Sequence, residues 1–182
     1  MEITTTRLEG VLVFTPRVFT DDRGSFHETW SAQRFMEATG VEATFVQDNE
    51  SRSAAGVVRG LHFQAPPHAQ GKLVRCSNGR ILDVVVDLRK GAPTFGQHVS
   101  VELTPENARQ VWIPPGFAHG FAALEDDSVL NYKCTAQYAP HSEGDLRWDD
   151  PHLAIDWGVS HPVLSAKDAV ATPWSEFESP FT

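Results

Sequence analysis

Apolar residues along the chain fall into short runs, most of which alternate with polar residues and are bounded by Gly, Pro, Asn or Asp. Alternation with a period of two is typical of β-strands, and the longer period of amphipathic helices is almost absent. One helix is predicted over Ala32–Thr39, with Ser31 as its cap, Gly40 as its end, and Phe35 and Met36 on one side. The predicted strands are Val11–Phe14, Phe26–Trp30, Thr44–Val46, Val57–Phe63, Leu73–Cys76, Ile81–Leu88, Val99–Leu103, Val111–Ile113, Phe121–Leu124 and Val129–Thr135.

The spacing of these strands predicts an all-β fold. Turn sequences such as Ser77-Asn78-Gly79 and Pro114-Pro115-Gly116 separate them, which favours a sandwich or a closed barrel. A double-sheet jelly roll leaves a mouth for a small ligand, and we predict this architecture. The segment Asp149–Thr182 lacks strand patterning, so we expect it to lie on the outside, irregular or as short helix. We expect residues 1–182 to form a single domain.

Composition and charge narrow the class of protein. The chain has 182 residues and a formal net charge of −9, with Lys and Arg scattered along it, which argues against binding to nucleic acid. No apolar stretch approaches the roughly 20 residues of a membrane helix, and no secretory signal is recognisable. Two cysteines are too few for a disulfide scaffold. A cytoplasmic protein without a membrane or nucleic-acid partner is the expectation.

Candidate chemistry begins with a histidine, a tyrosine and a lysine on neighbouring predicted strands. A strict period of two places His62 on the face opposite Arg59, and places Tyr132 between apolar neighbours on its own face. For His62 or Tyr132 alone, a structural role in the core explains the pattern at least as well. Together with Lys72, at the start of the next strand, they form a set suited to proton abstraction, enolate stabilisation and proton return.

Other common chemistries lack their sequence signatures. Neither a serine elbow (GxSxG) nor a phosphate loop (GxxxxGK[ST]) is present. No HxH or HxxxH pair occurs, and His62, His68 and His119 stand apart from one another. A metal centre needs three or four converging ligands, so we predict a site without metal.

Several polar residues are suited to a phosphate or a nucleobase. Arg23 is suited to bidentate binding of a phosphate, with Phe19 or Phe26 stacking on a base. The amides of Gln47 and Asn49 are suited to a nucleobase edge. A charged hairpin and an ordinary turn explain these two segments equally well.

Further polar residues give weaker signals. Tyr138, Glu143 and Arg147 are weaker candidates for binding. Asp83 and Asp87 alternate with apolar residues in one strand, so they are either inward polar groups or members of an exposed face. For Asp87 we favour the exposed face.

A set of ordered sequence strings resembles the dTDP-4-dehydrorhamnose 3,5-epimerase family. The resemblance runs from about Thr15 to Asp168. Any one string is weak, but their order and spacing make the set specific. The strings are Asp22-Arg23-Gly24, Gln47-Asp48-Asn49, Gly56–Gln64, Ala69–Arg75, Ile113–Phe121, Tyr132–Thr135, Trp148–Pro151 and Leu164–Asp168.

The resemblance implies a cupin-type jelly roll without metal or cofactor, acting on a dTDP-linked 4-keto-6-deoxy sugar. It implies a homodimer in which an N-terminal segment completes the neighbouring site. By position, His62 matches the catalytic base, Asp168 the carboxylate that orients it, Tyr132 the proton donor on the opposite face of the sugar, and Lys72 the cation near the C4 oxygen. The matching substrate-binding positions are Arg23, Phe26, Glu28, Gln47, Asn49, Arg59, His119, Tyr138, Glu143 and Lys167.

Three alternatives remain open from sequence. A related enzyme of antibiotic deoxysugar pathways that epimerises one carbon would share these motifs. A metal-dependent cupin is disfavoured by the missing HxH pair. A sugar-nucleotide-binding cupin without catalysis would not need His62 or Tyr132.

Overall fold

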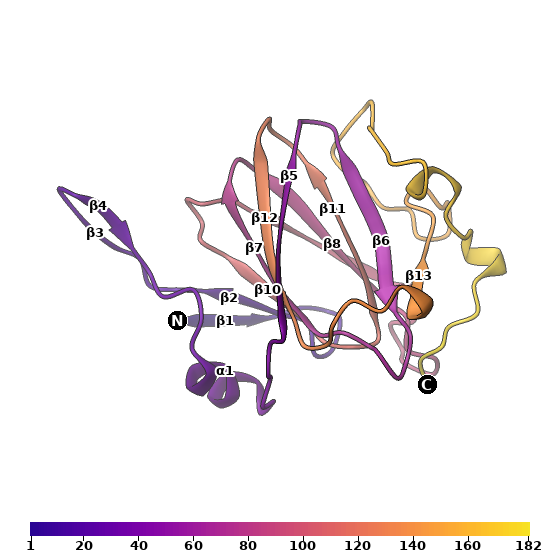
Figure 1. Cartoon of the computed structure of the whole chain (residues 1–182), viewed down its shortest axis with the longest axis horizontal. Coiled ribbons are helices and arrows are strands. Elements are labelled where there is room, and N and C mark those ends of the chain that lie inside the picture. Colours follow the sequence, from indigo (N-terminus) through magenta and orange to yellow (C-terminus); the bar gives the residue numbers. More distant parts are fainter.

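Two antiparallel sheets face each other in the computed structural model, which describes residues 1–182 (Figure 1). The first, six-stranded sheet has the order β1 (Glu2–Thr5), β2 (Leu12–Thr15), β10 (Gln110–Ile113), β7 (Lys72–Asn78), β12 (Ser128–Cys134) and β5 (Gln47–Ser53). The second, five-stranded sheet has the order β13 (Glu143–Asp145), β6 (Val58–Gln64), β11 (Phe117–Ala123), β8 (Ile81–Asp87) and β9 (His98–Leu103). The predicted jelly roll of the cupin type is confirmed.

Apolar side chains fill the space between the sheets because every second residue of each strand points inward. Leu130 of β12 and Val74 of β7 meet Ile81 and Val85 of β8 in one buried cluster. The intervening residues of β8, such as Val84, are buried on the other side, against the segment that follows β13. This second layer explains why β8 reads as a nearly continuous apolar run.

The segment after β13 covers the outer face of the five-stranded sheet, as predicted. Leu153, Trp157 and Phe181 pack there against strands of the sheet, and Figure 1 shows the segment beside β6 and β13. It contains two short 3-10 helices, η2 (Asp168–Val170) and η3 (Trp174–Glu176). Another short helix, η1 (Pro140–Ser142), precedes β13.

Helix α1 (Ala32–Thr39) is confirmed with its predicted ends. Ser31 Oγ accepts a hydrogen bond from the Arg34 backbone N–H, and Gly40 adopts a φ of 69°. Phe35 is buried, whereas Met36 is exposed rather than packed beside it. None of the helices has the length and apolar character needed to cross a membrane.

Two predicted strands near the N-terminus are wrong. Phe26–Trp30 and Thr44–Val46 are not strands; the chain forms a hairpin of β3 (Phe19–Asp21) and β4 (Gly24–Phe26), and later the polar edge strand β5. The aromatic residues that suggested strands, Trp30 and Phe45, instead pack against α1. Packing against the helix buries these apolar side chains without strand pairing.

A β-bulge in β6 overturns the predicted faces of Arg59 and His62. His119 of β11 pairs with His62, but two residues later Phe121 pairs with Arg59, so β6 holds one extra residue. The bulge brings both Arg59 and His62 to the lining of one cavity, although the Arg59 side chain stays largely exposed. Gly60, with a φ of 126°, allows it, because a Cβ atom there would lie 2.6 Å from the Gly120 Cα.

Replacing Gly60 with alanine is expected to lower the free energy of unfolding by about 3 kcal/mol, through backbone strain and overlap with Gly120. Urea denaturation measures the loss. The matched control is Gly24→Ala, because Gly24 has a φ of 127° and nothing lies within 4 Å of its added Cβ. Equal losses in both variants would show that the contact with Gly120 is unimportant.

Candidate active site

Two adjoining cavities open between the sheets and meet at three side chains. His62 from β6, Lys72 from β7 and Tyr132 from β12 line both cavities. We call the cavity lined by Tyr138 and Glu143 the mouth, with a volume of about 120 Å³, and the cavity lined by Arg59 and His119 the inner cavity, with a volume of about 200 Å³. The three residues that suggested proton abstraction therefore converge, although Lys72 and Tyr132 belong to the opposite sheet from His62.

His62 is paired with a carboxylate from the covering segment. Its Nε2 lies 2.6 Å from Oδ1 of Asp168, which is buried in η2. The hydroxyl of Ser165 donates to the other Asp168 oxygen at 2.8 Å and accepts from the Asp168 backbone N–H at 3.1 Å. Burial lowers the pKa of His62, and the charge and hydrogen bond of Asp168 oppose that shift. The imidazole is thereby held as a neutral base with a built-in counter-charge.

Burial shifts the pKa values of Tyr132 and Lys72 in opposite directions. Burial raises the pKa of Tyr132, so its phenol carries a proton at neutral pH. Burial lowers the pKa of Lys72, while nearby negative groups oppose the loss of its proton. A protonated phenol is a proton donor, and an ammonium ion stabilises a developing oxyanion.

The mouth of the site carries a connected set of polar groups. Glu143 binds Lys167 Nζ at 2.7 Å and accepts a hydrogen bond from the Tyr138 hydroxyl at 3.0 Å. These hydrogen bonds hold the pKa of Glu143 below its usual value, although burial alone would raise it. Gln47 and Asn49 of β5 line the same cavity, and their amides are hydrogen-bonded to each other at 2.9 Å.

Arg59 and His119 occupy the inner cavity, as two further predicted binding residues. Arg59 Nε donates to Ser53 Oγ at 3.2 Å. His119 of β11 lies 2.7 Å from Asp83 of β8, measured from Nε2 to Oδ1. The inner cavity, which His62 also lines, is therefore surrounded by basic side chains and a histidine ring.

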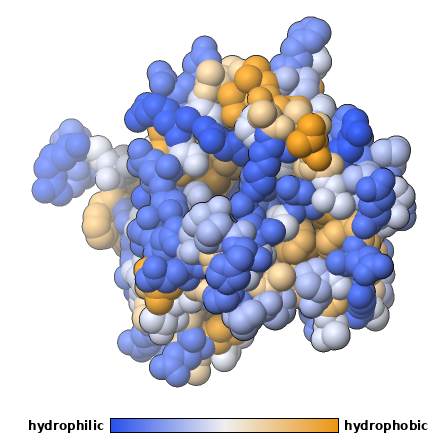
Figure 2. Space-filling model, turned by 45° about the vertical axis from the view of Figure 1, so that its right-hand side comes forward, coloured by the Kyte–Doolittle hydropathy of each residue, from blue (hydrophilic) through white to orange (hydrophobic).

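Three predicted binding residues lie away from this site within the chain. Arg23 and Phe26 belong to the β3–β4 hairpin, which extends from the body on the side opposite β6 (Figure 1). In the space-filling view a segment likewise projects beyond the outline at the left (Figure 2). Glu28 forms an ion pair with Arg34 at 3.2 Å. Phe26 is 69% exposed.

Sequence reasoning assigned no role to Asp83 or Ser165. Asp83 and Asp87 are both fully buried on the inner face of β8, so the exposed face favoured for Asp87 is wrong. Arg89 and Thr94 bind the Asp87 carboxylate, which explains how it is tolerated inside. The alternation in Ile81–Leu88 was the available signal for Asp83. For Ser165, the only indication in the sequence was its place in the segment Leu164–Asp168, which resembles the family.

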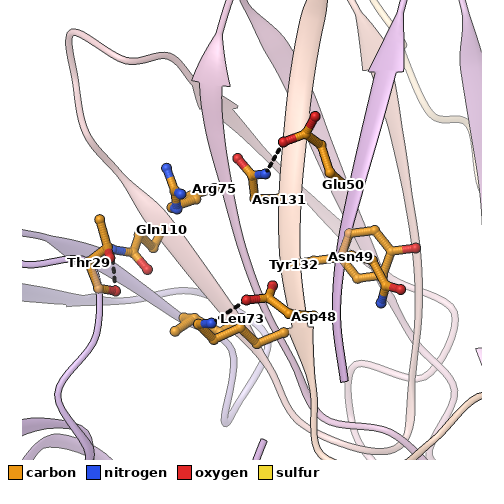
Figure 3. A pocket seen from close by; sticks show the side chains of 10 residues that line it. Thr29, Asp48, Asn49, Glu50, Leu73, Arg75, Gln110, Asn131 and Tyr132 are labelled. Carbon is orange, nitrogen blue, oxygen red and sulfur yellow. Dashed lines mark hydrogen bonds and ion pairs between the residues drawn. The ribbon is translucent and has the colours of Figure 1, made fainter. Parts of the chain in front are cut away.

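A second polar cavity lies on the outer face of the six-stranded sheet (Figure 3). Its volume is about 250 Å³, and it contains no histidine. Its carboxylates are engaged, Asp48 by Lys133 and Glu50 by Asn131. It therefore lacks a free base, in contrast to the interior cavities. Nowhere does the structure bring together three or more His, Cys, Asp or Glu side chains able to hold a metal.

Replacing Asp168 with asparagine is expected to lower kcat by about 10- to 1000-fold, because the imidazolium formed on proton abstraction loses its counter-charge. Asp168 raises the pKa of His62, so its loss lowers that pKa. The acid limb of kcat/KM, where His62 becomes protonated, should therefore move to lower pH. A pH–rate profile measures both effects; an unchanged rate and limb would exclude the pairing as functional.

Comparisons with known proteins agree with this geometry. The family model described as dTDP-4-dehydrorhamnose 3,5-epimerase matches residues 5–176. The dTDP-4-dehydrorhamnose 3,5-epimerase of Salmonella typhimurium is 52% identical over 172 residues, which are 94% of each sequence. The crystal structure of dTDP-6-deoxy-D-glucose-3,5-epimerase from Legionella pneumophila, in complex with dTDP-4-keto-L-rhamnose, has a TM-score of 0.93 at 47% identity and covers 97% of this chain and 94% of that one. A 3'-monoepimerase from Streptomyces bikiniensis in complex with dTDP-quinovose has a TM-score of 0.89 at 35% identity, covering 94% and 87%.

Proposed function

The chain belongs to the dTDP-4-dehydrorhamnose 3,5-epimerase family, and from this we propose that His62 and Tyr132 exchange protons with opposite faces of its sugar. Its activity is epimerisation at C3 and C5 of a dTDP-linked 4-keto-6-deoxy sugar in dTDP-rhamnose biosynthesis. The proposed residue roles are supported by the convergence of His62, Lys72 and Tyr132 on one cavity.

The C4 ketone of such a sugar acidifies the C–H bonds at C3 and C5. His62 removes the proton, and the electron pair moves through the C–C bond to the C4 oxygen, giving an enolate. Lys72 stabilises that oxyanion, and Tyr132 delivers a proton to the opposite face of the same carbon. The tyrosinate then regains a proton from water and His62 releases its own. Repetition at the second carbon completes the reaction without a redox step.

The binding residues divide between the two cavities. Arg59 and His119 are proposed to contact the sugar, and Gln47, Asn49, Tyr138, Glu143 and Lys167 the nucleotide side or the mouth. Their positions on the inner cavity and at the mouth support this division.

Deuterium incorporation tests the activity and the scheme together. In D2O, the substrate dTDP-4-dehydro-6-deoxyglucose should gain deuterium at both C3 and C5, read by NMR with a coupled reductase as trap. Exchange at one carbon would indicate a single-carbon epimerase, and no exchange would indicate binding without catalysis.

We also propose that the chain forms a homodimer in which the β3–β4 hairpin of one copy completes the site of the other. Exposed apolar side chains are concentrated in the first 46 residues and give this segment a surface suited to another copy. Arg23, Phe26 and Glu28, which match substrate-binding positions of the family, lie on or just after that hairpin. The exposed large apolar residues of this segment are Met1, Ile3, Val18, Phe19, Phe26, Met36, Val41 and Val46.

The outer face of the six-stranded sheet gives further support for a second copy. Arg75 projects into the outer cavity without a hydrogen bond or ion pair, and the buried Asn131 Oδ1 has no donor (Figure 3). Unpaired polar groups beside a protruding arm are typical of a surface that another chain covers.

Mixed dimers provide a direct prediction. His62→Asn disables the body of a site, whereas Arg23→Ala with Phe26→Ala disables the hairpin. If the hairpin acts on the partner, each mixed dimer retains one intact site, and random pairing should restore about a quarter of wild-type activity. Co-expression and a coupled reductase assay measure the recovery.

The matched control mixes His62→Asn with Tyr132→Phe, which both affect the body. No site is then intact, and activity should stay at the level of the separate variants. Absence of recovery in the hairpin mixture would show that the hairpin serves its own chain or none.

A further inference from the structure

Asp83 is a buried carboxylate that the proton transfers described above do not use. It lies on the inner face of β8 and is completely buried. Its Oδ1 atom accepts a hydrogen bond from Nε2 of His119 at 2.7 Å. Its Oδ2 atom is also buried and has no hydrogen-bond partner. A buried carboxylate oxygen without a donor is costly, so it indicates that this oxygen serves a nearby cation.

Lys72 is a suitable cation. It lines the inner cavity together with His119, and its ammonium group makes no hydrogen bond or ion pair within the chain. Burial lowers the pKa of Lys72, whereas the charges of Cys134, Asp83 and Glu143 raise it. Something must therefore keep the ammonium ion charged if it is to stabilise an enolate.

The other acidic groups near Lys72 are less suited to this task. Burial raises the pKa of Cys134, so its thiol is uncharged near neutral pH. Glu143 of β13 is already bound to Lys167 and Tyr138. Asp83 is left as the carboxylate with an unengaged oxygen.

The remaining titratable groups supply no negative charge to Lys72. Asp168 is engaged by His62 and Ser165. Burial keeps the phenol of Tyr132 protonated by raising its pKa. The other groups that line the inner cavity are neutral or cationic, and they are His62, Arg59 and His119.

We propose that Asp83 is a positioning residue for the epimerisation: one oxygen fixes the His119 ring, and the charge at the other keeps Lys72 an ammonium ion facing the C4 oxygen. This inference rests on the proposed function, in which Lys72 stabilises the enolate. One carboxylate thereby organises two donors on the same side of the substrate.

Asp83→Asn tests the proposal, because it removes the charge and keeps the size. We expect kcat to fall by about 10- to 100-fold with KM changed by less than about threefold. The alkaline limb of the kcat profile, where Lys72 loses its proton, should move to lower pH, while the acid limb set by His62 stays in place. In a Lys72→Ala background the Asp83→Asn loss should shrink. A pH-independent loss of the same size in both backgrounds would overturn the proposal.

Asp87→Asn is the matched control, because Asp87 is equally buried on the same face of the same strand but binds Arg89 and Thr94. It should lower stability without moving the alkaline limb. If the alkaline limb moved equally in Asp83→Asn and Asp87→Asn, Asp83 would only stabilise the strand and would have no specific effect on Lys72. If the wild type epimerises its substrate and Asp83→Asn does so at the same rate, this inference alone is refuted. If the wild-type protein is inactive, the proposed function is refuted.

A measurement on the unaltered protein covers the case in which Asp83→Asn does not fold. In ¹⁵N-histidine NMR spectra, His119 should carry its proton on Nε2 throughout the active pH range, because Nε2 faces Asp83. A neutral His119 protonated on Nδ1 would overturn the proposal.

Discussion

His62→Asn is expected to lower kcat by about 1000-fold and to abolish deuterium exchange at both C3 and C5. Of the other side chains that line both cavities, Tyr132 is protonated and Lys72 is the proposed cation, so neither is suited to be the base. Asparagine keeps a polar group near Asp168 but cannot accept the substrate proton. NMR-detected exchange under single-turnover conditions measures the loss without dependence on product release.

The control for this variant is His98→Asn, which changes a half-buried histidine of β9 outside both cavities. Its rate should stay close to that of the wild type. If His62→Asn retained exchange at either carbon, a second base would have to act there, and the single-base scheme would fail.

Tyr132→Phe is expected to separate proton removal from inversion. Net epimerisation should fall by about 100- to 1000-fold, because the face opposite His62 loses its proton donor. His62 can still remove a proton and return deuterium to the same face. We therefore expect exchange with retained configuration, visible by NMR as deuterated but unepimerised substrate.

The chain contains two tyrosines, so Tyr138→Phe is a natural comparison. Tyr138 donates its hydroxyl to Glu143 at the mouth. Loss of that hydroxyl should raise KM by a few-fold and leave inversion coupled to exchange. Uncoupling in Tyr138→Phe and not in Tyr132→Phe would move the acid from the interior to the mouth.

The core strands were predictable because their inward residues are apolar. β12 alternates in the expected way, and Leu130, Tyr132 and Cys134 share the predicted inner face. β8 was recognisable instead as a nearly continuous apolar run. β5 was not predicted as a strand, because its inward positions carry Gln47, Asn49 and other polar residues that line the cavity. A functional strand of this kind breaks the binary pattern by which strands are recognised.

The faces of Arg59 and His62 could not be predicted from alternation. The bulge in β6 depends on Gly60 meeting Gly120 across the sheet, which is a long-range contact. The pairing of His62 with Asp168 spans 106 positions of the chain, and resemblance alone suggested it. Local patterning reports on secondary structure, whereas these contacts depend on tertiary packing.

The hydrogen bonds around Asp168 imply that activity and folding respond differently to heat. Asp168 reaches His62 from a segment without regular strands, and Ser165 fixes it through two short-range bonds. Segments of this kind open locally at a lower free energy than a paired sheet. Detachment of η2 would leave the barrel intact but remove the carboxylate that keeps His62 basic. Thermal inactivation therefore reports on this segment, and loss of the sheet signal in circular dichroism reports on the barrel.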